Sequence, residues 1–267
     1  MKFVEIKGES YQKFSKAVFL ADNGSSNLSA LKNWEQPLNF RPNSNNLKQY
    51  QGGPCGLFAV LQAHIVIKEN DNNFQNASQE HILISLILDI FSRISSYYVF
   101  CDGFDAKTEY AHFQYTTDLD EAYSFILGTD YIKSYNACLL LTLSIVFASI
   151  GMSDLNVPAE PYIYGDRNTT MALVWLMLNG STNDANLAQT ENSNYRGTTQ
   201  TQIGIKVLNN PDKRVVGTWL NPNANVFVCH RGCHFFVVLT IADIFIVYDS
   251  LNDKSPFETT KKSLQWS

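Results

Sequence analysis

The stretch QYQGGPCGLFAVLQAHIV, residues 49–66, places one cysteine between a glycine-proline loop and an apolar run. The two glycines give the loop a backbone freedom that residues with a Cβ lack. Pro54 lacks an N–H and favours an extended conformation in the residue before it. After the loop, apolar residues recur at helical spacing in a segment without formal charge. We therefore predict a tight loop that leads into a buried helix over 55–69, with Cys55 in its first turn.

A cysteine at this position has two interpretations. The first turn of a helix offers free N–H groups and the positive end of the helix dipole, which favour an anion and therefore a thiolate. On this interpretation Cys55 is a nucleophile and the rest of the chain has to supply a base. A free cysteine also packs as a small hydrophobe, so a buried and inert Cys55 is the alternative.

Composition and charge narrow the class of protein. The chain has 267 residues, of which 45% are hydrophobic and 13% aromatic, and this is typical of a globular protein with a full core. A net charge of −5 argues against nucleic acid or an anionic membrane as the main partner. The five cysteines form no close framework of pairs, and the first residues lack the apolar core of a secretion signal. We therefore expect an intracellular, reduced protein, cytoplasmic or nuclear.

One segment, SYNACLLLTLSIVFASIGMS at 134–153, carries no formal charge and is long enough to cross a membrane. It contains Asn136, Thr142 and several serines, and the chain offers no second candidate of this kind. Helices that are apolar all round also occur in protein cores. We therefore expect a buried central helix and no membrane contact.

The remaining pattern predicts helices first and a sheet later. Residues 1–48 mix short apolar stretches with Asn/Ser-rich turns, which indicates strands or irregular wrapping. The runs HFFVVLTI and DIFIVYDS are β-rich and closely spaced, which predicts an antiparallel hairpin. This order predicts a single α+β domain over 1–267. The other expected elements are helices over 81–100, 118–131 and 169–180, a strand over 109–117, and an Asn-rich loop to Gly197.

Five histidines are available as the base for a cysteine nucleophile. His64 and His81 lie in apolar helical patterns, and His112 lies in the middle of a short strand without a companion. His234 opens the strand HFFVVL, and the second arm of that hairpin ends at Asp249. A histidine at the start of one strand and a carboxylate at the far end of the next can lie side by side.

The order of a cysteine on a helix, a histidine on a strand and then an aspartate is the chain order of papain-like enzymes. Gln49 precedes the cysteine, and its side-chain N–H₂ could bind a developing oxyanion together with the Cys55 N–H. Asp249 has a second interpretation as a plain turn residue at the end of the hairpin. Trp175 and Trp219 are expected to lie in the core.

The segment CHRGCH, residues 229–234, offers Cys229, His230, Cys233 and His234 as zinc ligands. Four ligands so close in the sequence can hardly surround one tetrahedral ion, and no C-x-x-C pair elsewhere completes the set. We therefore prefer strand residues plus one catalytic histidine, with no metal and no other cofactor. His230 is then expected to be dispensable for activity.

The sequence resembles the MINDY deubiquitinases, in particular the branch whose nucleophile loop reads Q-x-x-GGPCG. The resemblance is strongest over 49–252 and includes the blocks CLLLTLSIVFASI, ALVWLMLNGSTNDAN, RGTTQTQIGIKVL, VFVCHRGCHFFVVL and YDSLN in the same order. It implies a papain-like cysteine peptidase fold, in which a helical part carries the cysteine and an antiparallel sheet carries the histidine. It also implies hydrolysis of isopeptide bonds in polyubiquitin, typically in lysine-48-linked chains.

By matching position, the resemblance implies that Cys55 is the nucleophile, His234 the general base and acid, and Gln49 the oxyanion donor. Asp249 takes the third position, where the family does not have a simple papain-type asparagine. The residues HRGC before His234 depart from the Glu/Ser pair expected there and place Cys233 beside the proposed base. Ubiquitin and its chains are the expected partners. The alternatives are a catalytically silent ubiquitin-binding relative and a papain-like peptidase for another substrate.

Overall fold

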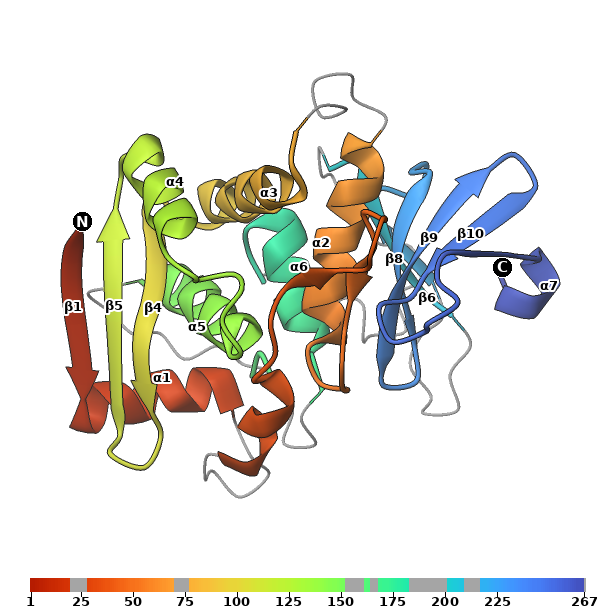
Figure 1. Cartoon of the computed structure of the whole chain (residues 1–267). Helices are drawn as coiled ribbons and strands as arrows, with labels where there is room; N and C mark the ends of the chain where they lie inside the picture. The colour runs from red at the N-terminus through yellow and green to blue at the C-terminus, as the bar shows by residue number, and fades with distance from the viewer. Residues whose placement is uncertain are drawn as a thin grey trace.

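The computed structural model describes residues 1–19, 28–69, 77–151, 161–163, 168–182, 201–208 and 217–266. Helices fill the middle of the molecule, with a three-stranded sheet on one side and a six-stranded sheet on the other (Figure 1). The helices are α1 (Gly8–Phe19), α2 (Cys55–Lys68), α3 (Gln79–Ile94), α4 (Leu119–Gly128), α5 (Ala137–Ile150), α6 (Met171–Asn179) and α7 (Lys261–Leu264), with a 3₁₀ helix at Leu28–Trp34. This arrangement confirms the α+β class.

The six-stranded sheet has the order β11-β10-β9-β8-β6-β7. Strands β9 and β10 form the predicted antiparallel hairpin, and β8 also pairs antiparallel with β9. The antiparallel sheet expected to carry the histidine is confirmed around β9, and the parallel pairing of β6 with β8 is an addition that was not expected. The strands are β6 (Ile203–Val207), β7 (Gly217–Leu220), β8 (Val226–Arg231), β9 (His234–Ile241), β10 (Ile244–Tyr248) and β11 (Phe257–Thr259).

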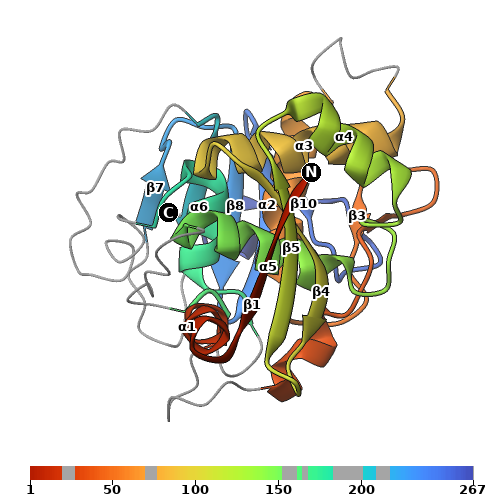
Figure 2. The same cartoon turned by 90° about the vertical axis from the view of Figure 1, so that its left-hand side faces the viewer.

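The three-stranded sheet has the order β1-β5-β4 and was not expected, because the pattern predicted helices first and a sheet later. Figure 2 views this sheet from the side of its edge strand β1, with α5 farther from the viewer. The strand expected over 109–117 is its central strand β5. The strands are β1 (Lys2–Lys7), β4 (Tyr98–Asp105) and β5 (Tyr110–Thr116), and a separate short pair consists of β2 (Asn39–Phe40) and β3 (Leu47–Lys48).

Two expected element boundaries need correction. Strands or irregular structure were expected over 1–48, and β1, β2 and β3 confirm part of this. Helix α1, which follows β1 directly and buries Tyr11, Phe14 and Val18, was not expected. The helix expected over 81–100 starts earlier, at Gln79 after the N-cap Ser78, and ends at Ile94. It ends there because the next residue is extended, with φ −150° and ψ 161°, and the aromatic residues that follow enter β4.

The apolar helices α2 and α5 lie in the core, as predicted. In α2 nearly every side chain is buried, because α6 and α3 cover part of it and strands β8 and β9 cover the rest. Helix α5 is buried almost throughout, and its Phe147 stacks on Phe113 with 4.0 Å between ring centroids. None of the helices in the described ranges is long and apolar enough to cross a membrane.

The smaller predictions have mixed outcomes. Helix α4 confirms the prediction for 118–131 with a shorter C-terminal end, and Asp118 caps it by accepting a hydrogen bond from the Glu121 N–H at 2.9 Å. Trp175 on α6 is fully buried, as expected for a core residue. The Trp219 side chain and the Asn-rich segment from 183 to Gly197 lie outside the described residues.

Candidate active site

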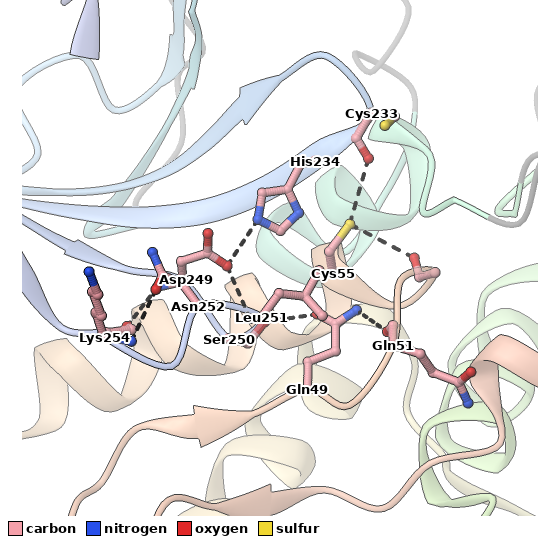
Figure 3. Close-up of polar contacts among 12 residues, drawn as sticks. Gln49, Gln51, Cys55, Cys233, His234, Asp249, Ser250, Leu251, Asn252 and Lys254 are labelled. Carbon is pink, nitrogen blue, oxygen red and sulfur yellow. Dashed lines mark hydrogen bonds and ion pairs between the residues drawn. The ribbon is translucent and has the colours of Figure 1, made fainter. Parts of the chain in front are cut away.

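Cys55 is the first residue of α2 and is only 2% exposed. Pro54 precedes it as the N-cap and makes no side-chain capping hydrogen bond. Gly53 has a φ of +120°, in a region that residues with a Cβ rarely adopt, and this explains a glycine in the loop. The Cys55 Sγ lies 3.9 Å from the Gly53 carbonyl oxygen and 3.8 Å from the Cys233 carbonyl oxygen (Figure 3).

Thr169 holds this loop against α6. Its hydroxyl donates to the Gly53 carbonyl at 2.8 Å and accepts from the Gly56 N–H at 3.0 Å, and its own N–H donates to the Gly53 carbonyl at 3.0 Å. A Cβ on Gly56 would lie 2.3 Å from the Thr169 Cγ2, so a side chain has no room there. The first turn of α2 is therefore fixed by a residue that the sequence pattern did not identify.

His234 is the first residue of β9, and Asp249 directly follows β10. Because the two strands are antiparallel neighbours, the start of one lies beside the end of the other. The His234 Nε2 and the Asp249 Oδ1 are 3.0 Å apart. In Figure 3 the other ring nitrogen of His234 lies on the side of the Cys55 sulfur. The structure therefore brings together the three residues that the sequence singled out as cysteine, histidine and aspartate.

The electrostatics of the pair favour a charged imidazole. Burial lowers the pKa of His234, but the hydrogen bonds to Asp249 and Cys55 and the charges of these two groups together raise it to about 10. Burial raises the pKa of Asp249, but other interactions hold that pKa below the ordinary value. These interactions are the hydrogen bond to His234, the positive charge of His234, and hydrogen bonds from the N–H groups of Leu251 and Asn252. At neutral pH the site therefore contains an imidazolium beside a carboxylate, as needed to donate a proton to a leaving group.

Gln49 is 3% exposed and has both ends of its side chain bound. Its Oε1 accepts from the Ser250 hydroxyl at 2.8 Å, and its Nε2 donates to the Gln51 carbonyl at 2.7 Å. Its backbone N–H donates to the Ser250 carbonyl at 2.9 Å. One Nε2 hydrogen is thereby used, and the structure gives the other no acceptor among the described residues. Gln49 therefore has a spare N–H donor in the loop that leads to Cys55.

Two residues before β3 support the loops on both sides of the site. Arg41 donates from Nη2 to the Ser250 and Asn252 carbonyls, both at 2.9 Å. Gln36 accepts from the Tyr50 N–H at 2.9 Å and donates to the Gln51 carbonyl at 3.1 Å. Neither was predicted, because each acts through backbone atoms of segments that no local pattern connects to it.

The residues of CHRGCH lie in different surroundings. Cys229 is buried in a small cluster with Phe227 and Phe236, and His230 is buried with its ring 4.4 Å from the ring of Phe235. Cys233 is exposed at the turn between β8 and β9. In the part of the chain that the structure describes, no group of three or more His, Cys, Asp or Glu side chains could hold a metal ion.

The other histidines lie away from the thiol. His64 Nε2 is 3.0 Å from Arg93 Nη2, and burial lowers the pKa of His64 to about 3. The expectation that His112 has no companion is wrong, because its Nδ1 contacts Asp102. The sequence missed this pair because the register of β4 shifts between Cys101 and Gly103, which leaves Asp102 unpaired next to Gly103, the partner of His112.

A cleft of 340 Å³ opens beside the His234–Asp249 pair on the side of α7. It gives the pair an open approach from outside the core. The lining side chains are Arg231, His234, Phe236, Val247, Asp249, Phe257, Thr259, Ser263 and Leu264. Comparisons of the chain with protein-family models, with curated proteins and with solved structures give no match.

Proposed function

We propose that the protein is a cysteine peptidase with a papain-like arrangement that hydrolyses isopeptide bonds between ubiquitins, in lysine-48-linked chains above all. The observation that carries the enzymatic part is the 3.0 Å contact of His234 with Asp249, with Cys55 on the other side of the ring. A thiol at a helix start that packs against a strand beginning with the histidine supports the papain-like arrangement. The choice of ubiquitin rests on the resemblance of the Q-x-x-GGPCG loop and the blocks that follow it.

In the proposed reaction the Cys55 thiolate attacks the isopeptide carbonyl carbon. The oxygen becomes an oxyanion, which the spare N–H of Gln49 and the Cys55 backbone N–H stabilise. His234 then donates its proton to the lysine amine as the carbon–nitrogen bond breaks. Water attacks the thioester that remains, His234 removes the proton from that water, and the carboxylate product and the thiol are released. Asp249 keeps the ring of His234 oriented throughout.

One observation favours a second candidate function, a catalytically silent ubiquitin-binding protein. Cys55 is only 2% exposed and two backbone carbonyls lie near its sulfur, so a substrate carbonyl needs a small movement of the loop to reach it. A protein that never makes this movement would keep its binding surface and show no turnover.

Incubation with di- and tetra-ubiquitins of defined linkage tests the proposal, together with a ubiquitin probe that carries a C-terminal propargyl group. We expect cleavage of lysine-48-linked chains and a covalent adduct on Cys55. The variant Cys55→Ala should abolish cleavage and labelling with an unchanged unfolding temperature. Chain binding without labelling would support the silent candidate. Labelling of Cys55 by a small papain inhibitor, but not by the ubiquitin probe, would point to a peptidase for another substrate.

A further inference from the structure

The turn after β10, residues 249–253, presents two neighbouring side chains to two different parts of the site. Asp249 contacts the imidazole of His234, and the Ser250 hydroxyl donates to the Gln49 Oε1 at 2.8 Å (Figure 3). The Gln49 N–H also donates to the Ser250 carbonyl at 2.9 Å. One turn therefore touches both the proposed base and the proposed oxyanion donor.

The Ser250 hydroxyl favours one orientation of the Gln49 carboxamide. A carboxamide has an acceptor end and a donor end. In the observed orientation the oxygen receives the Ser250 hydrogen and the nitrogen donates to the Gln51 carbonyl at 2.7 Å. The reverse orientation would bring two oxygens together at the Gln51 carbonyl. With both ends held, the second Nε2 hydrogen has a fixed direction.

We propose that Ser250 is a positioning residue: its hydroxyl holds the Gln49 carboxamide with its N–H₂ toward the reacting carbonyl. The inference rests on the proposed function, in which Gln49 stabilises the oxyanion. It adds a link between the two loops of the site, because the turn that orients His234 through Asp249 also orients Gln49 through Ser250.

The rest of the turn is held independently of the hydroxyl. Arg41 donates to the Ser250 and Asn252 carbonyls at 2.9 Å, and the Ser255 hydroxyl accepts from the Asp249 N–H at 2.8 Å. The variant Ser250→Ala keeps all of these backbone contacts and loses the hydrogen bond to Gln49. Its effect on turnover therefore reports on the orientation of Gln49.

A double-mutant cycle on the cleavage of lysine-48-linked di-ubiquitin tests the link. We expect Ser250→Ala to lower kcat about tenfold with KM unchanged, the size of one lost hydrogen bond. Ser250→Thr, which keeps a hydroxyl, should restore most of kcat. In a Gln49→Ala background the further loss from Ser250→Ala should disappear, because the carboxamide it orients is absent. Ser255→Ala is the matched control. The loss of kcat that it causes should be the same in the Gln49→Ala background, because the Ser255 hydroxyl acts through Asp249.

A full additional loss in the double variant of Gln49 and Ser250 would overturn the inference, since Ser250 would then act through the turn as a whole. A second measurement does not need turnover. In ¹⁵N-labelled protein the side-chain amide signals of Gln49, assigned with Gln49→Ala, should shift in Ser250→Ala and stay near their wild-type positions in Ser250→Thr. If the wild type cleaves no ubiquitin chain, the proposed function fails while these signals still decide the link. Unchanged signals in Ser250→Ala would refute it.

Discussion

Two histidine–aspartate pairs lie on opposite sides of the molecule. His112 contacts Asp102 on the three-stranded sheet, and His234 contacts Asp249 on the six-stranded sheet (Figure 1). The two histidine side chains are 25% and 29% exposed, so burial does not distinguish the pairs. A carboxylate next to an imidazole is thus not enough to identify a catalytic base. The groups around each pair have to be compared as well.

A cysteine lies close to each pair, but in different surroundings. Cys101 precedes Asp102, is fully buried, and its Sγ points to the Gly103 carbonyl at 3.6 Å. Burial raises the pKa of the Cys101 thiol far above its ordinary value, so it stays protonated. Cys55 instead lies at a helix start and interacts with the ring of His234. The comparison shows that a thiol at a helix start that interacts with the imidazole, rather than the residue types, separates the candidate site from the His112–Asp102 pair.

The largest effect should come from removing each histidine in turn. His234→Ala should lower kcat/KM for di-ubiquitin about 10²–10⁴-fold, because the thiol loses its base and the leaving amine its proton donor. His112→Ala, the matched control on the other sheet, should stay within a few-fold of the wild type. His230→Ala should also stay active if the variant folds, since its buried ring packs on Phe235. An essential His112 or His230 beside a dispensable His234 would reverse the assignment.

The next largest effect should come from Gln49, the proposed oxyanion donor in the loop beside the His234–Asp249 pair. Gln49→Ala should lower kcat about 10²–10³-fold with little change in affinity for ubiquitin chains, because the donor acts mainly in the transition state. Gln51→Ala is the control. The exposed Gln51 side chain donates to the Lys32 carbonyl at 3.3 Å, and the Gln51 carbonyl, which Gln49 uses, remains in the alanine variant. Cleavage within a few-fold of the wild type in Gln49→Ala would show that other groups hold the oxyanion.

The four residues of the candidate site could be proposed from the sequence because each one lies at the start or end of an element or loop that the pattern predicts. Cys55 begins an apolar helix, His234 begins a strand, Asp249 ends the hairpin, and Gln49 opens the glycine loop. The residues whose hydrogen bonds fix the loops and element ends around these four residues could not be found in this way. Their partners are distant in the chain and are often backbone atoms, which no residue type reveals. These residues are Gln36, Arg41, Thr169 and Ser250.

In the fold, too, features set by a local sequence pattern were predictable, and features that depend on distant segments were not. The helices at 55–68 and 137–150 were predictable because long uncharged apolar runs have to be buried. Helix α1 was missed although its buried residues have helical spacing, because charged and serine residues interrupt the run. The pairing of β1 with β5 and the parallel pairing of β6 with β8 join segments through long connections, and local periodicity carries no information on such partners.

The smallest expected effect is a change in how the free energy of unfolding depends on pH, and it comes from the charge of His234. The pKa of His234 is raised to about 10 from an ordinary value of 6.5. A raised pKa stabilises the folded state fully below pH 6.5, and this contribution is lost as the pH rises through about 10. The free energy of unfolding should therefore fall between these values. In Asp249→Asn part of the fall should disappear, on the order of 1–2 kcal/mol, because the imidazolium loses a charged hydrogen-bond partner.

Urea unfolding at several pH values, followed by tryptophan fluorescence, measures this difference. Asp102→Asn on the other sheet is the matched control for the loss of a carboxylate beside a histidine. The alkaline limb of kcat/KM should move to lower pH in Asp249→Asn, since the protonated ring that serves the leaving amine is then lost earlier. Equal pH profiles for the wild type and Asp249→Asn would mean that Asp249 is only the residue that closes the hairpin. The charge of His234 would then depend on Cys55 alone, and the His234–Asp249 pair would no longer differ in a useful way from the His112–Asp102 pair.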